Sequence, residues 1–438
     1  MSQLRPRTLI FLSPFIFVVF LTIWLWPRSS RLHVDSPIRF PSQQLPWEFS
    51  FHRDGNRHNL THEQCDQAFP ELYASIERSV APRMHDPIQL EELDIPPGKC
   101  MVRAMIYDGE LYIIDRGHPE NCCVLNARER IPATLNLIQR ALVASPEQVP
   151  NIEFVLSVDD LTRRSTQNIT WGYSRKDEDS DVWLVPDYGY WSWYGVDIPS
   201  FNTLHRKIEA LNGAIPWREK IQKAVWRGTV QLAQGLRGKL LEVADGKEWS
   251  DVKEFKMKQE NKTDYISLPD HCQYQYVLMT EGTSYSGRAK FLLLCNSVLV
   301  SHELKWNEFT THLMEANGPN QNFIQTESDW SDLEETMGYY LSHPEDAEVI
   351  ARRSYDLFGR RYHTPAAVSC YLRRLFAGWS QVQGFDVQFT TNSSTGEEVP
   401  RGLPYEAFSV SFPFDRTTDF KEWPIHNSEP SSPPQTPA

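Results

Sequence analysis

The chain has 438 residues, 40% of them hydrophobic, and a formal net charge of −13 at pH 7. This length and composition suffice for two ordinary domains with hydrophobic cores. The negative charge argues against nucleic acid and anionic membrane surfaces as partners, because either would need a basic face on the protein. It leaves room for a small phosphate-bearing ligand, which needs only a few local arginines.

An uncharged apolar run, Leu9–Trp26, lies near the start of the chain between basic residues. It is long enough to cross a bilayer, whose hydrocarbon core needs about 20 residues. Bulky Trp24 and Trp26 stand where small residues should precede a signal-peptide cleavage site, so we predict an uncleaved signal anchor. Residues 1–30 are then a cytoplasmic tail and transmembrane anchor of a single-pass type II membrane protein with a lumenal body.

Composition divides the rest of the chain into four predicted parts. Residues 31–60 form a stem, 61–215 an N-terminal domain, 216–383 a C-terminal domain, and 384–438 an irregular tail. The expected lumenal body carries four glycosylation signals, at Asn59, Asn168, Asn261 and Asn392. The anchor and a C-terminus without a KDEL-type signal favour the Golgi membrane, with the endoplasmic reticulum as second choice.

The first predicted domain begins with a helix over Cys65–Ser79 and continues with a hairpin over Cys100–Asp115, which turns at an Asp-Gly pair. Helical spacing over Ile131–Ala144 then leads to an apolar strand over Ile152–Val158. The pattern indicates a sheet with at least one helix against it.

Asp159 and Asp160 follow this strand directly. In open α/β sheets chemistry occurs beyond the carboxyl ends of strands, so these carboxylates are well placed for catalysis; a helix cap or turn is the alternative. A metal-binding Asp-x-Asp pair needs one residue between its carboxylates, and these two are adjacent. We therefore expect no metal.

Aromatic residues are concentrated in Asp181–Tyr194. Such residues are usually core, but they also stack on sugar rings and bases. A helix over Phe201–Asn212 follows, and the gap before Lys220 marks the predicted domain boundary.

The second half contains two strand-loop-helix units. Lys223–Arg227 is a short β-prone run followed by Gly228 and Thr229, and Arg237 opens a helical run that ends at Ala244. A helix start offers free N–H groups, and an arginine there adds a fork that matches phosphate oxygens. This unit therefore predicts a phosphate contact.

The next unit repeats this arrangement. The strand Tyr274–Met279 precedes the small-residue loop Gly282–Gly287, and Arg288 stands at the start of the helix Ala289–Cys295. The loop residues let the backbone approach a ligand closely. Two such loops at the same end of a sheet suit a sugar-nucleotide diphosphate.

Further helical periods cover Asp329–Leu341, His343–Phe358 and Pro365–Val382. Alternating strands and helices in both halves predict an α/β fold of two Rossmann-like domains facing a cleft, preceded by the transmembrane helix.

A wider set of positions carries a family resemblance: Trp226-Arg227-Gly228-Thr229, Arg237, Leu240-Leu241, His271-Cys272-x-Tyr274-x-Tyr276, Gly282, Ser286, Arg288, Lys290-Phe291 and Cys295. Together they resemble glycosyltransferase family 90, which includes fungal capsule-associated proteins and animal protein O-glucosyltransferases. The resemblance runs from about Cys65 to Tyr371. It implies the GT-B type of two-domain fold, with residues 61–215 as the acceptor-side domain and 216–383 as the donor-binding domain.

The resemblance also implies roles for single residues. The general base aligns best with Asp160, although Thr162 stands where the family usually has proline, so the choice between Asp159 and Asp160 stays open. Pro186 and Trp191 match a cleft-wall pattern, with Trp191 as the stacking candidate. The expected donor contacts are Thr229, Arg237, Thr283, Ser284, Tyr285, Ser286, Gly287 and Arg288.

Seven cysteines in an oxidising lumen predict disulfides. The family's pattern implies bridges from Cys272 to Cys295 and from Cys65 to Cys370. Cys100 then pairs with Cys122 or Cys123, and one thiol stays free.

These features favour an inverting, metal-independent transferase that moves xylose or glucose from a UDP-sugar to a hydroxyl of a glycan or protein. It would need no cofactor. The alternative is a catalytically inactive lumenal module on the same fold that binds carbohydrate or protein. The sequence does not identify the sugar, the acceptor, the linkage or the oligomeric state.

Overall fold

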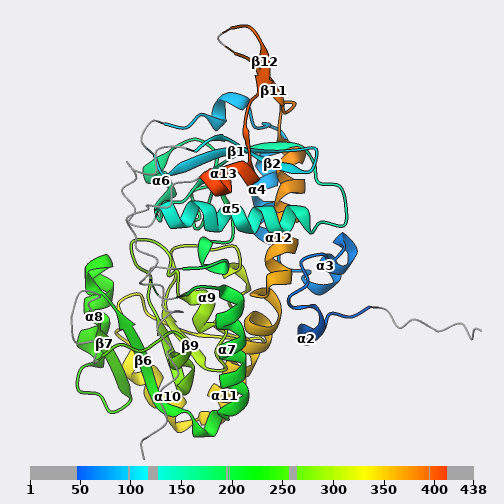
Figure 1. Ribbon diagram of the computed structural model, residues 1–438. Coiled ribbons are helices and arrows are strands. Elements are labelled where there is room, and N and C mark those ends of the chain that lie inside the picture. The colour runs from blue at the N-terminus through cyan, green and yellow to red at the C-terminus, as the bar shows by residue number, and fades with distance from the viewer. Residues whose placement is uncertain are drawn as a thin grey trace, which may run out of the picture. The chain divides into compact units, whose positions relative to one another are not determined.

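Two large β-sheets with helices packed on them, and a small two-stranded sheet, make up the described part of the protein, as a computed structural model shows (Figure 1). The structure describes residues 47–96, 99–116, 127–193, 196, 198–255, 264–393 and 395–411. The first sheet lies in the upper part of the view and the second in the lower part.

The first sheet has six strands in the order β13-β2-β1-β3-β4-β5. Their bounds are β1 Met101–Tyr107, β2 Glu110–Asp115, β3 Ile152–Ser157, β4 Thr170–Gly172, β5 Val182–Leu184 and β13 Leu403–Pro404. The β1–β2 hairpin turns at Asp108 and Gly109, with φ angles of 49° and 79°. Positive φ at both positions is the tight hairpin turn that an Asp-Gly pair favours.

This hairpin makes the first sheet mixed. β1 runs antiparallel to β2 and β3, whereas β3, β4 and β5 are parallel. The prediction of a Rossmann-like first domain is therefore wrong, because a two-residue turn can join only antiparallel strands.

The second sheet is parallel throughout, in the order β10-β9-β8-β6-β7. Its strands are β6 Ile221–Gly228, β7 Ser250–Glu254, β8 Tyr274–Met279, β9 Val298–His302 and β10 Ile324–Thr326. β9 is buried along its whole length, as expected of a parallel strand covered on both faces. The strand order reverses between β6 and β8, and ligands bind in the crevice beyond the carboxyl ends of strands at such a point.

Helices cover both sheets, and α12 joins the two halves (Figure 1). The α-helices are α2 Phe51–Asp54, α3 His62–Ala68, α4 Ala74–Arg83, α5 Ala127–Val143, α6 Thr162–Ser165, α7 Phe201–Ala214, α8 Gln234–Ala244, α9 Ala289–Leu292, α10 Leu333–Ser342, α11 Pro344–Ser354, α12 Pro365–Val382 and α13 Tyr405–Ser411. A π-helix, Tyr355–Tyr362, follows α11. Short 3-10 turns cover Leu90–Leu93, Tyr188–Tyr190, Trp217–Glu219, Val230–Leu232, Pro269–Gln273 and Thr311–Leu313.

Aromatic packing fixes α12 on the first sheet. The Trp171 ring stacks on Phe154 at 3.9 Å between centroids and meets Trp379 of α12 edge-on at 5.6 Å. The indole N–H of Trp379 donates to the Glu153 carbonyl at 2.9 Å. Each edge-on or stacked pair adds about 1 kcal/mol beyond the area it buries.

The described ends of the chain are more ordered than the sequence suggested. Within the predicted stem, Asp54 and Leu60 are buried, and the Gly55 carbonyl accepts from the N–H of Ala366 in α12. Within the predicted irregular tail, a hairpin of β11 (Thr390–Asn392) and β12 (Glu398–Pro400) precedes β13. The expected single helix over Cys65–Ser79 is two helices, interrupted at Pro70.

The predicted membrane helix needs correction. Leu9–Trp26 lies outside the described residues, and within those residues no helix has both the length and the apolar character to cross a bilayer. The described residues support a mixed α/β fold, and they support neither the predicted transmembrane helix nor the type II Golgi anchoring that we derived from it. Apolar composition alone indicated that segment, and composition does not establish a helix.

Two disulfides have the predicted pairing. Cys65 of α3 is bonded to Cys370 of α12, with 5.6 Å between their Cα atoms. Cys272 is bonded to Cys295, 4.9 Å apart, and this bridge ties the entry of β8 to the segment after α9. Cys100 is also in a disulfide, and its candidate partners Cys122 and Cys123 lie outside the described residues.

A buried lysine beside the second bridge makes stability depend on pH. Lys220 donates from Nζ to the Cys272 carbonyl at 2.8 Å and to Ser297 Oγ at 3.0 Å, and burial lowers its pKa from 10.5 to about 7. The unfolded state therefore holds more protons than the folded state between pH 7 and 10.5, so the free energy of unfolding rises with pH in this window.

We expect the wild type to gain about 2 kcal/mol relative to Lys220→Met between pH 7 and 9. Denaturant unfolding of both proteins at the two pH values measures this difference. A constant difference would show that Lys220 keeps an ordinary pKa.

Candidate active site

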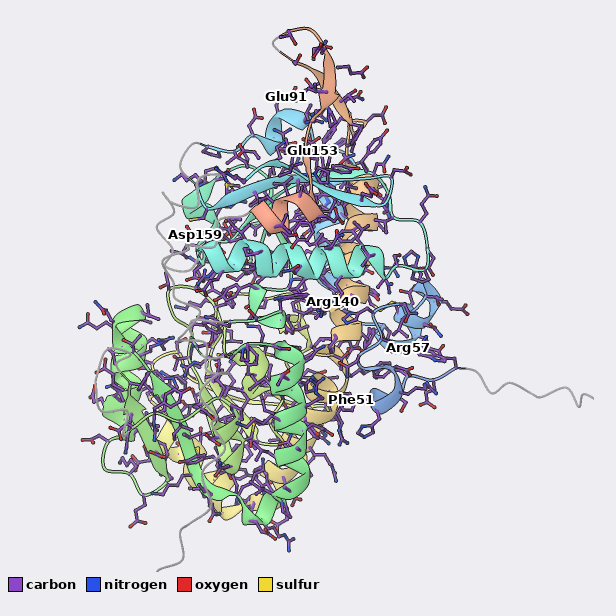
Figure 2. All side chains as sticks on the ribbon, viewed as in Figure 1. Phe51, Arg57, Glu91, Arg140, Glu153 and Asp159 are labelled. Atoms are coloured by element: carbon purple, nitrogen blue, oxygen red, sulfur yellow. A yellow bond between two sulfur atoms is a disulfide. The ribbon has the colours of Figure 1, made fainter. Side chains whose placement is uncertain are left out.

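The two adjacent aspartates after β3 have different environments. Asp159 is 1% exposed, and its Oδ1 accepts from the Leu161 N–H at 3.0 Å, which fixes the turn after the strand. Figure 2 places it near the amino-terminal end of α5. The Asp160 side chain is 36% exposed and lines the largest cavity described below. Asp160 is therefore the one available to a ligand.

Arg130 of α5 holds the Asp160 carboxylate. Its Nη1 lies 2.8 Å from Asp160 Oδ1 and also donates to the Val158 carbonyl at 3.1 Å. The guanidinium stacks over the Tyr188 ring, 4.6 Å from its centroid. Sequence reasoning missed Arg130, which is a buried arginine in the first turn of an otherwise apolar helix face.

Arg237 lies in the first turn of α8. It is buried, and the segments that follow β6 and β8 hold its guanidinium. Its Nε donates to Thr280 Oγ1 and to the Glu281 carbonyl, both at 3.0 Å, and its Nη1 donates to the Thr229 carbonyl at 2.8 Å. Burial lowers its pKa to about 10.

Arg288 reaches the same place from the second loop, where it donates to the Arg227 carbonyl. Burial, and then the nearby charge of Arg237, lower its pKa to about 10. Within the described part of the chain, neither Arg237 nor Arg288 forms an ion pair with a carboxylate. Two neighbouring cations without a counter-ion favour an anionic ligand between them.

A cavity of about 470 Å³ joins these groups. All the predicted donor contacts and Asp160 line it, together with Arg130, Tyr188, Trp193, Val196, Arg227, Gly228, Leu232, Phe255, Tyr265, Ile266, Leu268, His271 and Gly282. It lies at the carboxyl ends of β6 and β8, where the strand order reverses. Ser284 Oγ donates to the Asp160 carbonyl at 2.6 Å across it, so both halves of the chain form its wall.

The tryptophan on the aromatic wall of the cavity is Trp193 and not the predicted Trp191. Trp191 is not among the cavity-lining residues; its ring lies under the guanidinium of Arg140 at 4.0 Å. Trp193 lines the cavity instead and meets Tyr188 edge-on at 5.6 Å. The 3-10 turn Tyr188–Tyr190 breaks the alternation of side chains, so sequence spacing could not choose between the two tryptophans.

The predicted helix Ala289–Cys295 is only one turn, α9, so its dipole contributes little. The loop before it is fixed by its own hydrogen bonds, from Gly282 N–H to the Ser284 carbonyl at 2.9 Å and from Ala289 N–H to the Ser286 carbonyl at 2.8 Å. The arginines, rather than a helix end, supply the positive charge.

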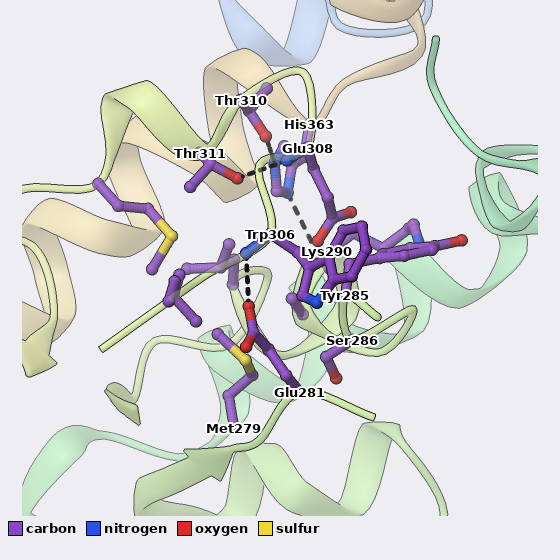
Figure 3. Close-up of a pocket in the computed structure, with 14 residues that line it drawn as sticks. Met279, Glu281, Tyr285, Ser286, Lys290, Trp306, Glu308, Thr310, Thr311 and His363 are labelled. Carbon is purple, nitrogen blue, oxygen red and sulfur yellow. Dashed lines mark hydrogen bonds between the residues drawn. The ribbon is translucent and has the colours of Figure 1, made fainter. Parts of the chain in front are cut away.

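A second, small cavity of about 20 Å³ lies behind this loop and shares Tyr285 and Ser286 with the large one. Figure 3 shows Glu281, Lys290 and Glu308 around it. Glu281 Oε1 accepts from the N–H groups of Lys305 and Trp306 at 2.9 and 2.8 Å. Burial raises the pKa of Glu308 to about 8. A polar network thus supports the loop from the side opposite the large cavity.

The absence of a side chain at Gly228 lets the Arg288 guanidinium lie close to the backbone after β6. A Cβ on Gly228 would lie 2.5 Å from Trp226 Cζ2 and 3.0 Å from Arg288 Nη2. We expect Gly228→Ala to displace the guanidinium and to weaken the binding of a diphosphate-bearing probe, for which UDP serves, at least tenfold, as measured by calorimetry. Gly213→Ala, at a glycine with open space beside it, is the matched control. Unchanged UDP affinity in Gly228→Ala would show that the Arg288 position is unimportant for binding.

A cavity with paired arginines on one wall and a carboxylate on the other suits an enzyme that transfers a group from a phosphate-bearing donor. The comparison with known families agrees: the sequence model of glycosyl transferase family 90 matches residues 62–399. The chain belongs to this family, which confirms the resemblance, and it is a glycosyltransferase.

The chain is similar to several curated proteins. O-glucosyltransferase rumi of Drosophila pseudoobscura pseudoobscura is 22% identical, over 65% of this chain and 71% of that protein. Protein O-glucosyltransferase 1 of Homo sapiens is 22% identical, over 67% of this chain and 76% of its own length. Protein O-glucosyltransferase 2 of Danio rerio is 24% identical, over 54% of this chain and 48% of its own length.

Proposed function

We propose that the chain transfers glucose or xylose from a UDP-sugar to a hydroxyl of a protein or glycan, with inversion at the anomeric carbon and without a metal. Relatives named protein O-glucosyltransferases support glucose and a protein acceptor. The single observation that carries the proposal is the pair of arginines, buried Arg237 and half-buried Arg288, which have no carboxylate partner among the described residues and line one cavity with Asp160.

The arginines answer the main difficulty of the reaction, which is the charge that grows on the leaving diphosphate. Arg237 and Arg288 are held by backbone carbonyls before any ligand binds, so they need little reorganisation. The N–H groups of the loop Thr283–Gly287 add further donors. Thr229 and Ser286 would orient the phosphates or the sugar through their hydroxyls.

Asp160 would act as the general base. The acceptor oxygen forms a bond to the anomeric carbon as the bond from that carbon to the diphosphate oxygen breaks, and the electron pair leaves with UDP. The acceptor's proton passes to the Asp160 carboxylate. Arg130 and the carbonyl contact with Ser284 fix this group in place, and attack from the face opposite UDP inverts the configuration.

The compartment is also a proposal. Disulfides persist in oxidising environments, so the bonds of Cys65, Cys100 and Cys272 favour the secretory pathway. Asn59, Asn168 and Asn392 are exposed and accessible for glycosylation, whereas Asn261 lies outside the described residues.

A donor screen with the full chain tests the proposed function. UDP release would be measured with UDP-glucose, UDP-xylose and other UDP-sugars, alone and with protein or glycan acceptors, in buffer containing EDTA. We expect release with UDP-glucose or UDP-xylose, stimulated by acceptor and unaffected by EDTA. No turnover with any UDP-sugar would contradict the donor assignment, and activity lost in EDTA and restored by a divalent cation would contradict metal independence.

A further inference from the structure

A fully buried ion pair joins the two halves of the chain beside the cavity. Lys290 Nζ lies 2.6 Å from Asp187 Oδ2, and the two side chains are 1% and 2% exposed. Lys290 belongs to α9, which follows the loop Gly282–Gly287, here called the donor loop. Asp187 lies in the half of the chain that forms the first sheet, directly before the turn Tyr188–Tyr190. The pair is therefore a contact between the two walls.

Each partner is also bonded within its own wall. Lys290 Nζ donates to the Gly287 carbonyl at 2.5 Å, at the end of the donor loop. Asp187 Oδ1 accepts from the Gly189 N–H at 2.7 Å and so holds the turn that presents Tyr188 to the cavity. The ion pair thus connects Gly287, the last residue of the donor loop, to the turn Tyr188–Tyr190 on the opposite wall of the cavity.

A second link lies at the other side of the loop, where Ser284 Oγ donates to the Asp160 carbonyl at 2.6 Å. Trp193 of the first half packs against the same loop, close enough to Gly287 that a Cβ there would lie 3.0 Å from its ring. The donor loop is therefore fixed to the first half at two points, the backbone of Asp160 and the side chain of Asp187.

We infer that Lys290 and Asp187 are positioning residues, which set the distance between the donor diphosphate and the Asp160 carboxylate. The inference rests on the proposed function. Neither residue lines the large cavity, so neither would touch the donor. The pair acts through the loop.

The choice of an ion pair at this place supports a positioning role. Replacing a buried ion pair by apolar residues of similar volume is often neutral or stabilising, so such a pair is weak evidence for a stability role. An ion pair does fix the distance and the orientation between the two walls of the cavity, because its two charged groups must meet, whereas apolar packing does not. A misplacement of about 1 Å can reduce a reaction rate 100-fold.

The test combines Asp187→Asn with Lys290→Met. This double variant removes both charges of the pair, and burial, which raises the pKa of the nearby Glu308 to about 8, keeps that carboxyl mostly protonated at pH 7. The turn should persist because the introduced amide oxygen can still accept from the Gly189 N–H. We expect a melting temperature close to that of the wild type and a Kd for UDP within about threefold. We expect kcat for UDP release from the best donor, with acceptor present, to fall about 10- to 100-fold.

Glu153→Gln is the matched control, because Glu153 is a fully buried carboxylate paired with Arg103 and Arg401 away from the cavity. It should lower the melting temperature and leave kcat unchanged. A double variant with kcat within twofold of the wild type would overturn the inference, as would a kcat that falls in parallel with UDP affinity. A wild type without turnover would instead refute the proposed function.

Discussion

Arg288→Ala is expected to reduce sugar transfer at least 100-fold while the protein stays folded. The loss of one preorganised donor to a developing oxyanion typically costs about 3 kcal/mol of transition-state stabilisation. Arg288 has no carboxylate partner within the described residues, so its removal leaves no buried charge unpaired, and it relieves the repulsion from Arg237. The melting temperature should therefore stay the same or rise.

Turnover and UDP affinity of Arg288→Ala would be measured together, and Arg237→Ala should behave in the same way. Arg218→Ala is the control, because Arg218 is an exposed arginine of the same half that does not line the cavity. Near-normal turnover in Arg288→Ala would refute the assignment of the phosphate site.

Asp160→Asn is expected to reduce kcat by a factor of about 100 to 10,000, the usual contribution of a general base. UDP should still bind with an affinity close to that of the wild type, because Asp160 lies on the wall opposite the arginines. An asparagine keeps the shape of the side chain and can still contact Arg130, so the fold should survive.

Asp159→Asn separates the two adjacent aspartates. Its amide oxygen can still accept from the Leu161 N–H, so the turn after β3 should persist and transfer should stay within a few-fold of the wild type. Loss of transfer in Asp159→Asn, with activity retained in Asp160→Asn, would show that the wrong carboxylate is assigned.

Local signals in the sequence predicted much of this arrangement. The β-prone run of β8, the Asp-Gly turn between β1 and β2, and the bounds of α12 all agree with the structure. The paired loops after β6 and β8 could be located because glycine, hydroxyl residues and arginine have clear physical roles there. Their convergence follows from a parallel sheet, whose carboxyl ends share one edge.

Features that depend on contacts between distant segments could not be predicted in this way. The pairing of Arg130 with Asp160 requires α5 to lie against the end of β3. The choice of Trp193 over Trp191 depends on a single 3-10 turn, and the ion pair between Lys290 and Asp187 joins residues from different halves. The hairpin of β1 and β2 was predicted, but the antiparallel pairing of β1 with β3 was missed, because periodicity identifies strands without giving the direction of strands that no short turn joins.

A crystal structure of the full chain with UDP tests the central claim most directly. We predict diphosphate oxygens within hydrogen-bonding distance, roughly 3 Å, of the guanidinium groups of both Arg237 and Arg288, with the Asp160 carboxylate facing them across the cavity. UDP bound at another surface, or a diphosphate that contacts neither arginine, would contradict the account.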